Sequence, residues 1–310
     1  MSPVRVFTLT TLAMSAFAGN SLLCRLALSH TRIDAAAFTA ARLLSGAAML
    51  MVAARIRGAT RDGHAIPRGG DGNWMSALLL LAYAAGFSFA YVGMSAATGA
   101  LLLFGAVQAT MFGVGISRGE SLHAGGVCGV LLAIGGLVAL LMPGLSAPPP
   151  GRAVLMLGAG VAWGVYSLRG RGAGDSTQVT AGNFIRAAPI ALALSLLLPG
   201  KSVLDQAGIG YAVLSGALAS GVGYVIWYSV LPALKPATAA VVQLCVPVIA
   251  TLGGSVLLAE PITARLALSS CAILGGIAIV VLDRPRAAPA RVIPQGTSTH
   301  QSIKRPSSEH

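Results

Sequence analysis

Apolar residues fall in ten long runs along the chain, separated by short polar stretches. Most runs are about 20 residues long, the length at which an α-helix crosses a hydrocarbon core of about 30 Å. Lipid offers the backbone no hydrogen-bond partner, and the alternation typical of membrane β-strands is absent. The pattern therefore predicts an all-α membrane protein with ten transmembrane helices. They cover Val4–Leu28, Ala35–Ala54, Trp74–Ala96, Ala97–Ile116, Leu122–Met142, Ala153–Leu168, Val179–Leu198, Gly208–Leu231, Pro236–Leu258 and Ala264–Leu282.

The second five runs resemble the first five at a nearly constant offset. ATGA begins at Ala97 and ATAA at Ala237, 140 residues later. The same offset relates Gly113 to Gly253, Glu120 to Glu260, and Gly135–Gly136 to Gly275–Gly276. A unit with an odd number of spans forces its two copies to cross the bilayer in opposite directions, an arrangement found in solute transporters. We expect inverted five-helix repeats over residues 4–142 and 153–282, followed by a disordered cytoplasmic tail over 283–310.

Composition agrees with a membrane protein, and charge sets its orientation. The chain is 55% hydrophobic and 10% charged, whereas a soluble domain carries about 25% charge. With the N-terminus in the cytoplasm, fourteen of the 21 Lys and Arg residues lie inside, five lie outside, and Arg42 and Arg186 lie within helices. This positive-inside bias predicts cytoplasmic N- and C-termini in a bacterial inner (plasma) membrane. The net charge of +12 is thus mainly a topology signal, and we expect no nucleic-acid partner.

The first run also has features of a secretory signal peptide. Arg5 precedes an apolar stretch, and Ala16–Ala18 matches an A-x-A cleavage site. However, the apolar run continues to Leu28, and Arg25 and Arg42 have counterparts 144 residues later in Arg169 and Arg186. We therefore expect a retained first helix.

Longer sequence features resemble a known transporter family. The stretch from Gly216 to Leu282 holds a Tyr/Trp-bearing helix, then LKPATAAVVQLCVPVIATLGGSVLLAEPIT, then a Gly-Gly helix. It resembles the second repeat of EamA-type members of the drug/metabolite transporter superfamily, and the first repeat is similar around FTAARLLSG at Phe38. The resemblance implies a ten-helix basket with a central cavity and alternating access. It suggests export of amino acids or other metabolites, with efflux of drug-like compounds or metabolite uptake as alternatives, and does not set the solute.

The resemblance also highlights a proline in the ninth run. Pro247 lies within that run, whereas Val107 occupies the corresponding position in the first repeat. A proline removes a backbone donor and bends a helix, so only the later helix is expected to kink at this position. Pro247 is our candidate gating hinge, and a static bend is the alternative.

Acidic residues are absent from the middle of every predicted helix. All nine Asp and Glu residues fall in loops, at helix ends or in the tail. Proton and sodium coupling often use intramembrane carboxylates, so the sequence favours exchange or facilitated efflux. Glu120 and Glu260 follow the fourth and ninth helices. We interpret them as structural caps that favour the helix dipole, with a gate as the alternative.

Arg42 and Arg186 are the cations that lie well inside helices, at equivalent positions of the two repeats. Each is about two helical turns, roughly 10 Å, from its membrane face. A snorkelling side chain or a structural bond to carbonyl groups would explain both. The alternative hypothesis is that one of them faces the cavity and attracts a solute carboxylate.

Amide and aromatic side chains complete the candidate binding set. An amide in a low-dielectric setting needs a partner, so these groups line a cavity or hydrogen-bond to another helix. Mid-helix aromatic residues favour a cavity for an amphiphilic or amino-acid-like solute. The candidates are Asn20, Tyr83, Gln108, Trp163, Tyr224, Tyr228 and Gln243, with helices one, three, four, six, eight and nine lining the path.

Other classes of function find little support in the sequence. An intramembrane enzyme would need a catalytic set, but no His lies in the middle of a run, His123 lies at the very start of the fifth, and HExxH does not occur. A channel would need a pore helix or a selectivity-filter run. The four cysteines lie in separate helices without CxxC spacing and suit packing. We expect no enzyme activity and no cofactor; the expected partners are a small-molecule solute and the lipid bilayer, with the chain a monomer or homodimer.

Overall fold

The structure is a computed structural model, and it describes residues 1–59, 72–119, 123–144, 147–170, 175–198, 205–234 and 236–283. The regular structure in these residues is entirely helical. Residues 284–310 of the predicted tail and Glu120 lie outside the described residues. The helices are α1 (Pro3–His30), α2 (Ala35–Ala59), α3 (Trp74–Tyr91), α4 (Ala96–Ser117), α5 (Ala124–Leu141), α6 (Pro150–Arg169), α7 (Ser176–Leu197), α8 (Gln206–Val213), the π-helix η1 (Leu214–Val222), α9 (Gly223–Val230), the 3₁₀-helix η2 (Leu231–Ala233), α10 (Pro236–Gln243), α11 (Cys245–Leu258) and α12 (Ala264–Leu282).

These elements form ten segments that are long and apolar enough to span a membrane, as predicted. Large apolar side chains on the outer surface are exposed, including Val256 at 81% and Leu196 at 77%. Such an apolar exterior suits contact with lipid chains. The prediction of an all-α protein with ten membrane-spanning helices is confirmed.

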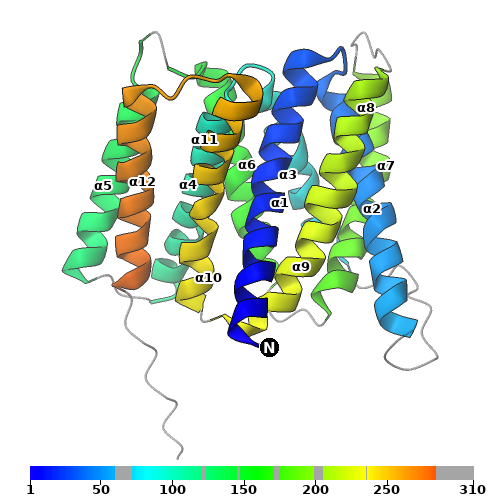
Figure 1. The fold of residues 1–310 in the computed structure, drawn as a ribbon, viewed down its shortest axis with the longest axis horizontal. Coiled ribbons are helices and arrows are strands. Elements are labelled where there is room, and N and C mark those ends of the chain that lie inside the picture. Colours follow the sequence, from blue (N-terminus) through cyan, green and yellow to red (C-terminus); the bar gives the residue numbers. More distant parts are fainter. Residues whose placement is uncertain are drawn as a thin grey trace, which may run out of the picture.

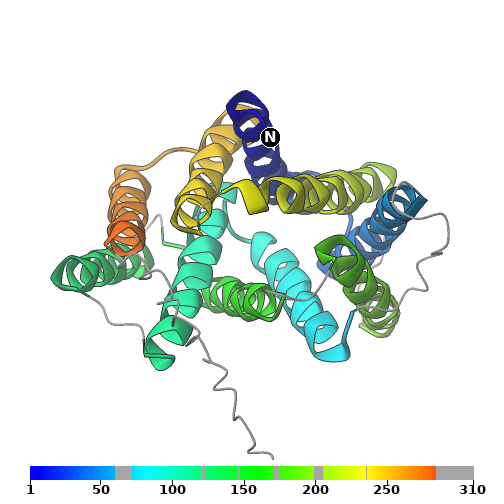
Figure 2. The ribbon, with the colours of Figure 1, turned by 90° about the horizontal axis from the view of Figure 1, so that it is seen from below.

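The helix axes are roughly aligned, and the chain direction reverses from each span to the next (Figure 1). We call the end where α1 begins the N-side and the end where α1 finishes the far side. Helices α5 and α12 pack against each other at one edge of the molecule, and α2 packs against α7 near the opposite edge. Figure 2 shows the remaining helices arranged around a central region, with α3, α4 and α6 facing α1, α9 and α10.

Polar side chains set the helix ends. The acidic residues that the structure describes all lie there: Asp34, Asp175, Asp205, Glu260 and Asp283. Asp205 caps α8 by accepting from the backbone N–H groups of Ala207 and Gly208. It also accepts from the backbone N–H of Arg32, a bond that lowers the pKa of its carboxyl group. Carboxylates at helix N-termini are favoured by the helix dipole.

The boundary predicted between the third and fourth helices is wrong. The expected third helix ran to Ala96, but α3 ends at Tyr91 and a turn precedes α4. The turn ends at Ser95, whose hydroxyl accepts from the backbone N–H of Thr98 and so caps α4. Hydropathy hides this turn because the residues around it are small or apolar, whereas the capping serine is a local signal for a helix start.

The eighth and ninth spans are irregular. Within the eighth, η1 widens the helix, and Gly216 lies so close to α2 that a Cβ there would overlap the backbone carbonyl of Arg42. The ninth span divides at Leu244 into α10 and α11, three residues before Pro247, whereas α4 is continuous. Pro247 lacks the N–H that would bond to the carbonyl of residue 243, which accounts for the break.

Candidate functional site

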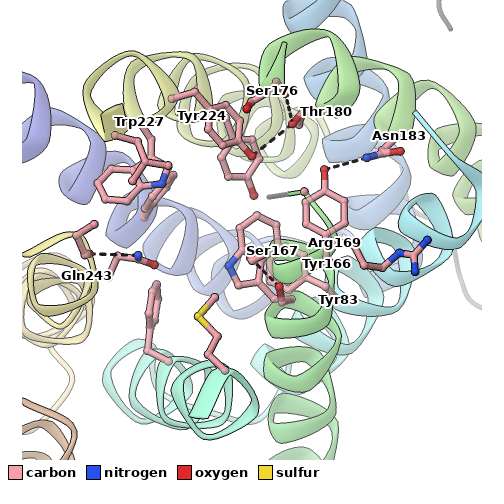
Figure 3. Close-up of a pocket in the computed structure, with 18 of the residues that line it drawn as sticks. Tyr83, Tyr166, Ser167, Arg169, Ser176, Thr180, Asn183, Tyr224, Trp227 and Gln243 are labelled. Atoms are coloured by element: carbon pink, nitrogen blue, oxygen red, sulfur yellow. Dashed lines mark hydrogen bonds between the residues drawn. The ribbon is translucent and has the colours of Figure 1, made fainter. Parts of the chain in front are cut away.

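A cavity of about 580 Å³ lies in the centre of the bundle. Residues of α1, α3, α4, α6, α7, α9 and α10 line it (Figure 3). The lining includes the exposed residues Asn73, Arg169 and Gly170 at N-side helix ends. Toward the far side it extends to Ser21 and Phe87, past the middle of the bundle. The cavity therefore opens at the N-side.

An aromatic cluster forms one wall, with Trp163 of α6 at its centre. The Trp163 ring lies 4.8 Å from that of Tyr83, 5.2 Å from that of Tyr166 and 5.4 Å from that of Tyr224, between centroids. The rings of Tyr166 and Tyr224 are nearly parallel to it, at 22° and 18°. Tyr228 stacks on Tyr224 at 6.2 Å. Four of the aromatic residues predicted from the sequence thus meet in one place, and their faces suit apolar or planar groups.

Amide and hydroxyl groups orient the tyrosines of this cluster. Asn183 donates to the Tyr166 hydroxyl at 3.2 Å and accepts from the backbone N–H of Asn73 at 3.0 Å. Thr180 donates to the Tyr228 hydroxyl at 3.4 Å. The bond from Asn183 to Tyr166 and the bonds of Thr180 are drawn as dashed lines in Figure 3. Side chains of α7 therefore hold the hydroxyl ends of Tyr166 and Tyr228.

Seven of the nine predicted binding residues line the cavity: Asn20, Tyr83, Gln108, Trp163, Tyr224, Tyr228 and Gln243. Gln243 donates to the carbonyl of Ala239 on its own helix at 3.3 Å. Their roles in binding stay predictions. The lining residues among those described do not include Arg42, Arg186 or Pro247.

The two intrahelical arginines have different surroundings. Arg42 is 1% exposed, behind the cavity wall, and its Nη2 donates to the Tyr83 hydroxyl at 3.0 Å. Arg186 is only partly buried; it donates to the carbonyl of Gly182 at 2.9 Å and lies 6.0 Å from the Trp74 ring. The structural bond expected as one explanation is thus present at Arg186, whereas Arg42 contacts a residue of the cavity wall.

An ion pair lies on the far side of the bundle, one helical turn beyond the lining residue Ser21. Arg25 of α1 donates from Nε to Oε1 of Glu260 at 3.0 Å and from Nη1 to the carbonyl of Tyr91 at 3.1 Å. The second oxygen of Glu260 accepts from the backbone N–H of Ala96 at 2.8 Å. The completely buried Tyr91 lies beneath, its hydroxyl donating to the Ala96 carbonyl. We call Arg25, Glu260, Tyr91 and Ala96 the far-side latch.

Backbone geometry places Glu260 in the latch. Ala259, at the end of α11, has φ 51° and ψ 29°, in the left-handed region. The backbone N–H groups of Ala259 and Glu260 both donate to the carbonyl of Gly254, that of Glu260 at 3.1 Å, which ends the helix in a widened turn. Gly254 also leaves room for the carboxylate, because a Cβ there would lie 2.8 Å from Oε2. Glu260 therefore binds to the start of α4 rather than capping the helix that follows it.

Comparisons with known proteins agree with the helical architecture. Residues 152–282 match the model of the EamA-like transporter family. The uncharacterised protein PA1977 of Pseudomonas aeruginosa is 55% identical over 280 residues, or 90% of this chain and 96% of that protein. An uncharacterised transporter of Archaeoglobus fulgidus is 41% identical over 76 residues, which are 24% of this chain and 28% of that protein. The chain belongs to the EamA-like transporter family.

Solved structures extend the agreement to the fold. One chain, titled "Crystal structure of protein", superposes with a TM-score of 0.64 at 20% identity, covering 89% of this chain and 96% of that one. As an EamA-like protein with ten apolar helices, the chain is a multi-pass membrane transporter. A transporter acts on a small-molecule solute and resides in a lipid bilayer. Among the described residues, no group of three or more His, Cys, Asp and Glu could hold a metal ion.

Sequence reasoning missed the contribution of α7. Ser176, Thr180 and Asn183 of this helix line the cavity. They are spaced four and three residues apart and so share one helix face. That spacing is a readable signal in the sequence STQVTAGN. Arg169 at the end of α6 was also missed as a lining residue, because its position near a helix end suggested only a topology signal.

Proposed function

We propose that this EamA-like protein is an inner-membrane exporter of small metabolites such as amino acids. The observation that carries the proposal is the cavity, which is enclosed by helices from both halves of the chain, open at the N-side and closed by the far-side latch. The positive-inside bias assigns the N-side to the cytoplasm. A cavity in this state takes up its solute from the cytoplasm.

The cavity lining indicates the chemistry of the solute. Its volume of about 580 Å³ falls in the range of about 300–1,000 Å³ typical of small-molecule pockets. The described lining offers aromatic faces, amides and hydroxyls, and Arg169 is its charged residue. A zwitterion or a neutral amphiphile finds partners there, whereas a hydrated metal cation finds no carboxylate among the described lining residues.

Alternating access between the inverted repeats would move the solute. In this proposal the latch opens, the N-side closes, and the solute leaves at the far side. No Asp or Glu lines the described cavity, which supports exchange or facilitated efflux rather than coupling through an intramembrane acid. The stacked rings around Trp163 also favour a second candidate, efflux of planar drug-like compounds.

Export from bacterial cells that overproduce the chain tests the proposal. Extracellular amino acids and related metabolites are profiled, and retention of ethidium is followed in parallel. We expect one or a few amino acids to accumulate outside, and Trp163→Ala or Gln243→Ala to abolish the accumulation. Trp74→Ala is the matched control, because Trp74 is 61% exposed at the N-side and outside the cavity lining.

The outcomes separate the candidates. Loss of ethidium without any change in metabolites would favour drug efflux. Accumulation inside the cells would reverse the proposed direction. An extracellular profile that does not differ from that of cells carrying an empty vector would contradict metabolite export.

A further inference from the structure

Arg42 is a buried cation without an acidic partner among the described residues. Its side chain is 1% exposed, and its Nε and Nη1 atoms are buried with no hydrogen-bond partner among the described residues. The salt bridge found in the described part of the chain joins Arg25 to Glu260 and does not involve Arg42. An uncompensated charge inside a membrane protein is costly and is typically retained for function. Its unused donors therefore need an explanation.

The surroundings of Arg42 direct its charge toward the cavity. Its guanidinium carbon lies 4.8 Å from the ring centre of Phe87 and 5.3 Å from that of Tyr83. Both rings line the cavity. Cation–π contacts stabilise the guanidinium group in part, but they supply no negative charge. The wall formed by Tyr83 and Phe87 thus separates the cavity from a positive charge by the thickness of one aromatic side chain.

The hydroxyl group of Tyr83 connects this charge to the cavity. Its oxygen accepts from Nη2 of Arg42 at 3.0 Å and from Nδ2 of Asn20 at 3.4 Å. Asn20 is oriented in turn, because its Oδ1 accepts from the Ser215 hydroxyl. A phenolic hydroxyl has one proton to donate. With two donors directed at its oxygen, Tyr83 is left to donate that proton to an acceptor in the cavity.

Local structure holds this arrangement in place. Ser215 belongs to the π-helix η1, whose widened turn lies against both α1 and α2. The neighbouring Gly216 allows η1 to approach the backbone of Arg42 more closely than any side chain would permit. π-Helical distortions within α-helices are frequent at functional sites.

Tyr166 provides an internal comparison. This residue also lines the cavity, but the amide of Asn183 that donates to its hydroxyl is neutral. A charged donor strengthens the hydrogen bond that the acceptor group can make in turn. The Tyr83 hydroxyl is therefore the stronger donor toward an anion, and the Tyr166 hydroxyl is the weaker one.

We propose that Tyr83, backed by Arg42 and held by Asn20, is the carboxylate-binding subsite of the cavity. The solute is then an organic carboxylate, zwitterionic or anionic, whose apolar part lies against Trp163, 4.8 Å from the Tyr83 ring. This assignment rests on the proposed transport site and specifies the group that it recognises. Arg42 acts through Tyr83 as a positioning residue and supplies the charge that compensates the carboxylate.

Ligand binding to the purified full-length protein in nanodiscs tests the subsite. The probes are 3-phenylpropanoate, its uncharged amide of the same shape, and L-phenylalanine, and binding is followed by thermal shift and by tryptophan fluorescence. We expect the carboxylate to bind about 10-fold more tightly than the amide, as for a charge-assisted hydrogen bond. Comparison with L-phenylalanine tells whether the solute also needs an ammonium group.

Variants assign that preference to the subsite. Arg42→Met and Tyr83→Phe should each reduce the carboxylate-to-amide preference to roughly twofold or less, and Arg42→Lys should keep part of it. Tyr83→Phe removes a single oxygen atom, so it remains informative should Arg42→Met fail to fold. Tyr166→Phe should weaken both probes and keep most of the preference, because its hydroxyl is the weaker donor.

The subsite and the export function fail in different ways. A wild-type protein that binds both probes equally, or neither, overturns the subsite, as does an unchanged preference in Arg42→Met and Tyr83→Phe. Loss of the preference in these variants, with retention in Tyr166→Phe, supports it. Cells that export no amino acid while the purified protein keeps the preference contradict the proposed export function and leave the subsite standing.

Discussion

The two ends of the central cavity carry equivalent arginines in different situations. At the far side, Arg25 pairs with Glu260 at 3.0 Å and donates to a backbone carbonyl of α3. At the N-side, Arg169 is exposed and reaches Ser76 and Asn73 at 3.4 Å each, without an acidic partner among the described residues. The two arginines correspond at an offset of 144 residues. One end therefore carries an ion pair between helices, and the other is open.

This difference shows that few interactions hold the far side together. The latch joins α1, the turn before α4 and the end of α11 through one carboxylate with both oxygens occupied. Charge-assisted hydrogen bonds are strong but few. Removing Glu260 therefore releases several spans at once, whereas changes at the N-side act on an end that is already open.

Glu260→Ala is expected to have the largest effect. It leaves Arg25 and the Ala96 N–H without their acceptor, at a cost of about 2–3 kcal/mol to the closed far side. A cysteine at Ser21, which lines the cavity and is 1% exposed, should then react at least about 10-fold faster with an impermeant thiol reagent applied from outside.

The labelling experiment uses a protein whose four native cysteines are replaced by Ala. Arg265→Gln is the matched control, because it removes a cation near the start of α12 on the same side without touching the latch. Labelling of the Ser21→Cys protein that stays slow in the Glu260→Ala background would contradict a closing role for the pair.

The ion pair also shows where the sequence was insufficient. Arg25 and Glu260 are 235 positions apart, and no local pattern links them. The repeat match identifies Glu260 as a candidate residue, but its position in the sequence predicts only that it caps the helix that follows. The left-handed conformation of Ala259 turns the carboxylate onto α4 instead, and a non-glycine residue in that region is not apparent from the sequence.

Other features were predictable because they depend on local chemistry. Run length identifies the spans, because a helix of about 20 apolar residues crosses the bilayer with its backbone hydrogen bonds satisfied. Mid-helix amides and aromatic residues such as Asn20 and Trp163 do line the cavity. The surroundings of Arg42 could not be predicted in this way. Helical spacing placed it within the membrane, but the ring of Tyr83 between its charge and the cavity follows from packing against α3.

Pro247→Ala should have the next largest effect. The break at Leu244 separates α10, which lines the cavity, from α11, which leads to the latch. Alanine restores the missing backbone donor and favours a continuous helix, so we expect a higher melting temperature and a turnover lowered by roughly fivefold. Transport rate and thermal stability are measured on the same preparation. Unchanged turnover would contradict a hinge role and indicate that Pro247 only bends the helix.

Arg169→Gln is expected to act more weakly and at the other end. If the repeats exchange roles during transport, Arg169 helps to close the N-side when the latch opens. Its present bonds are long and exposed, so the open state seen here should be unaffected, while turnover falls by roughly threefold. The far-side labelling rate at Ser21→Cys is the control and should not change. A parallel increase in that rate would instead couple Arg169 to the latch.

Ala259→Gly should have the smallest effect and the opposite sign to Glu260→Ala. Ala259 holds a left-handed conformation at φ 51°, which costs an L-residue about 1 kcal/mol relative to glycine. Glycine should therefore stabilise the closed latch, slow labelling of the Ser21→Cys protein by roughly threefold, and raise its melting temperature slightly. Ala264→Gly, in the first turn of α12, should not slow labelling, because glycine there only loosens a helix. Faster labelling in Ala259→Gly would mean that the strain at Ala259 does not oppose closure, and the far side would owe its stability to the ion pair alone.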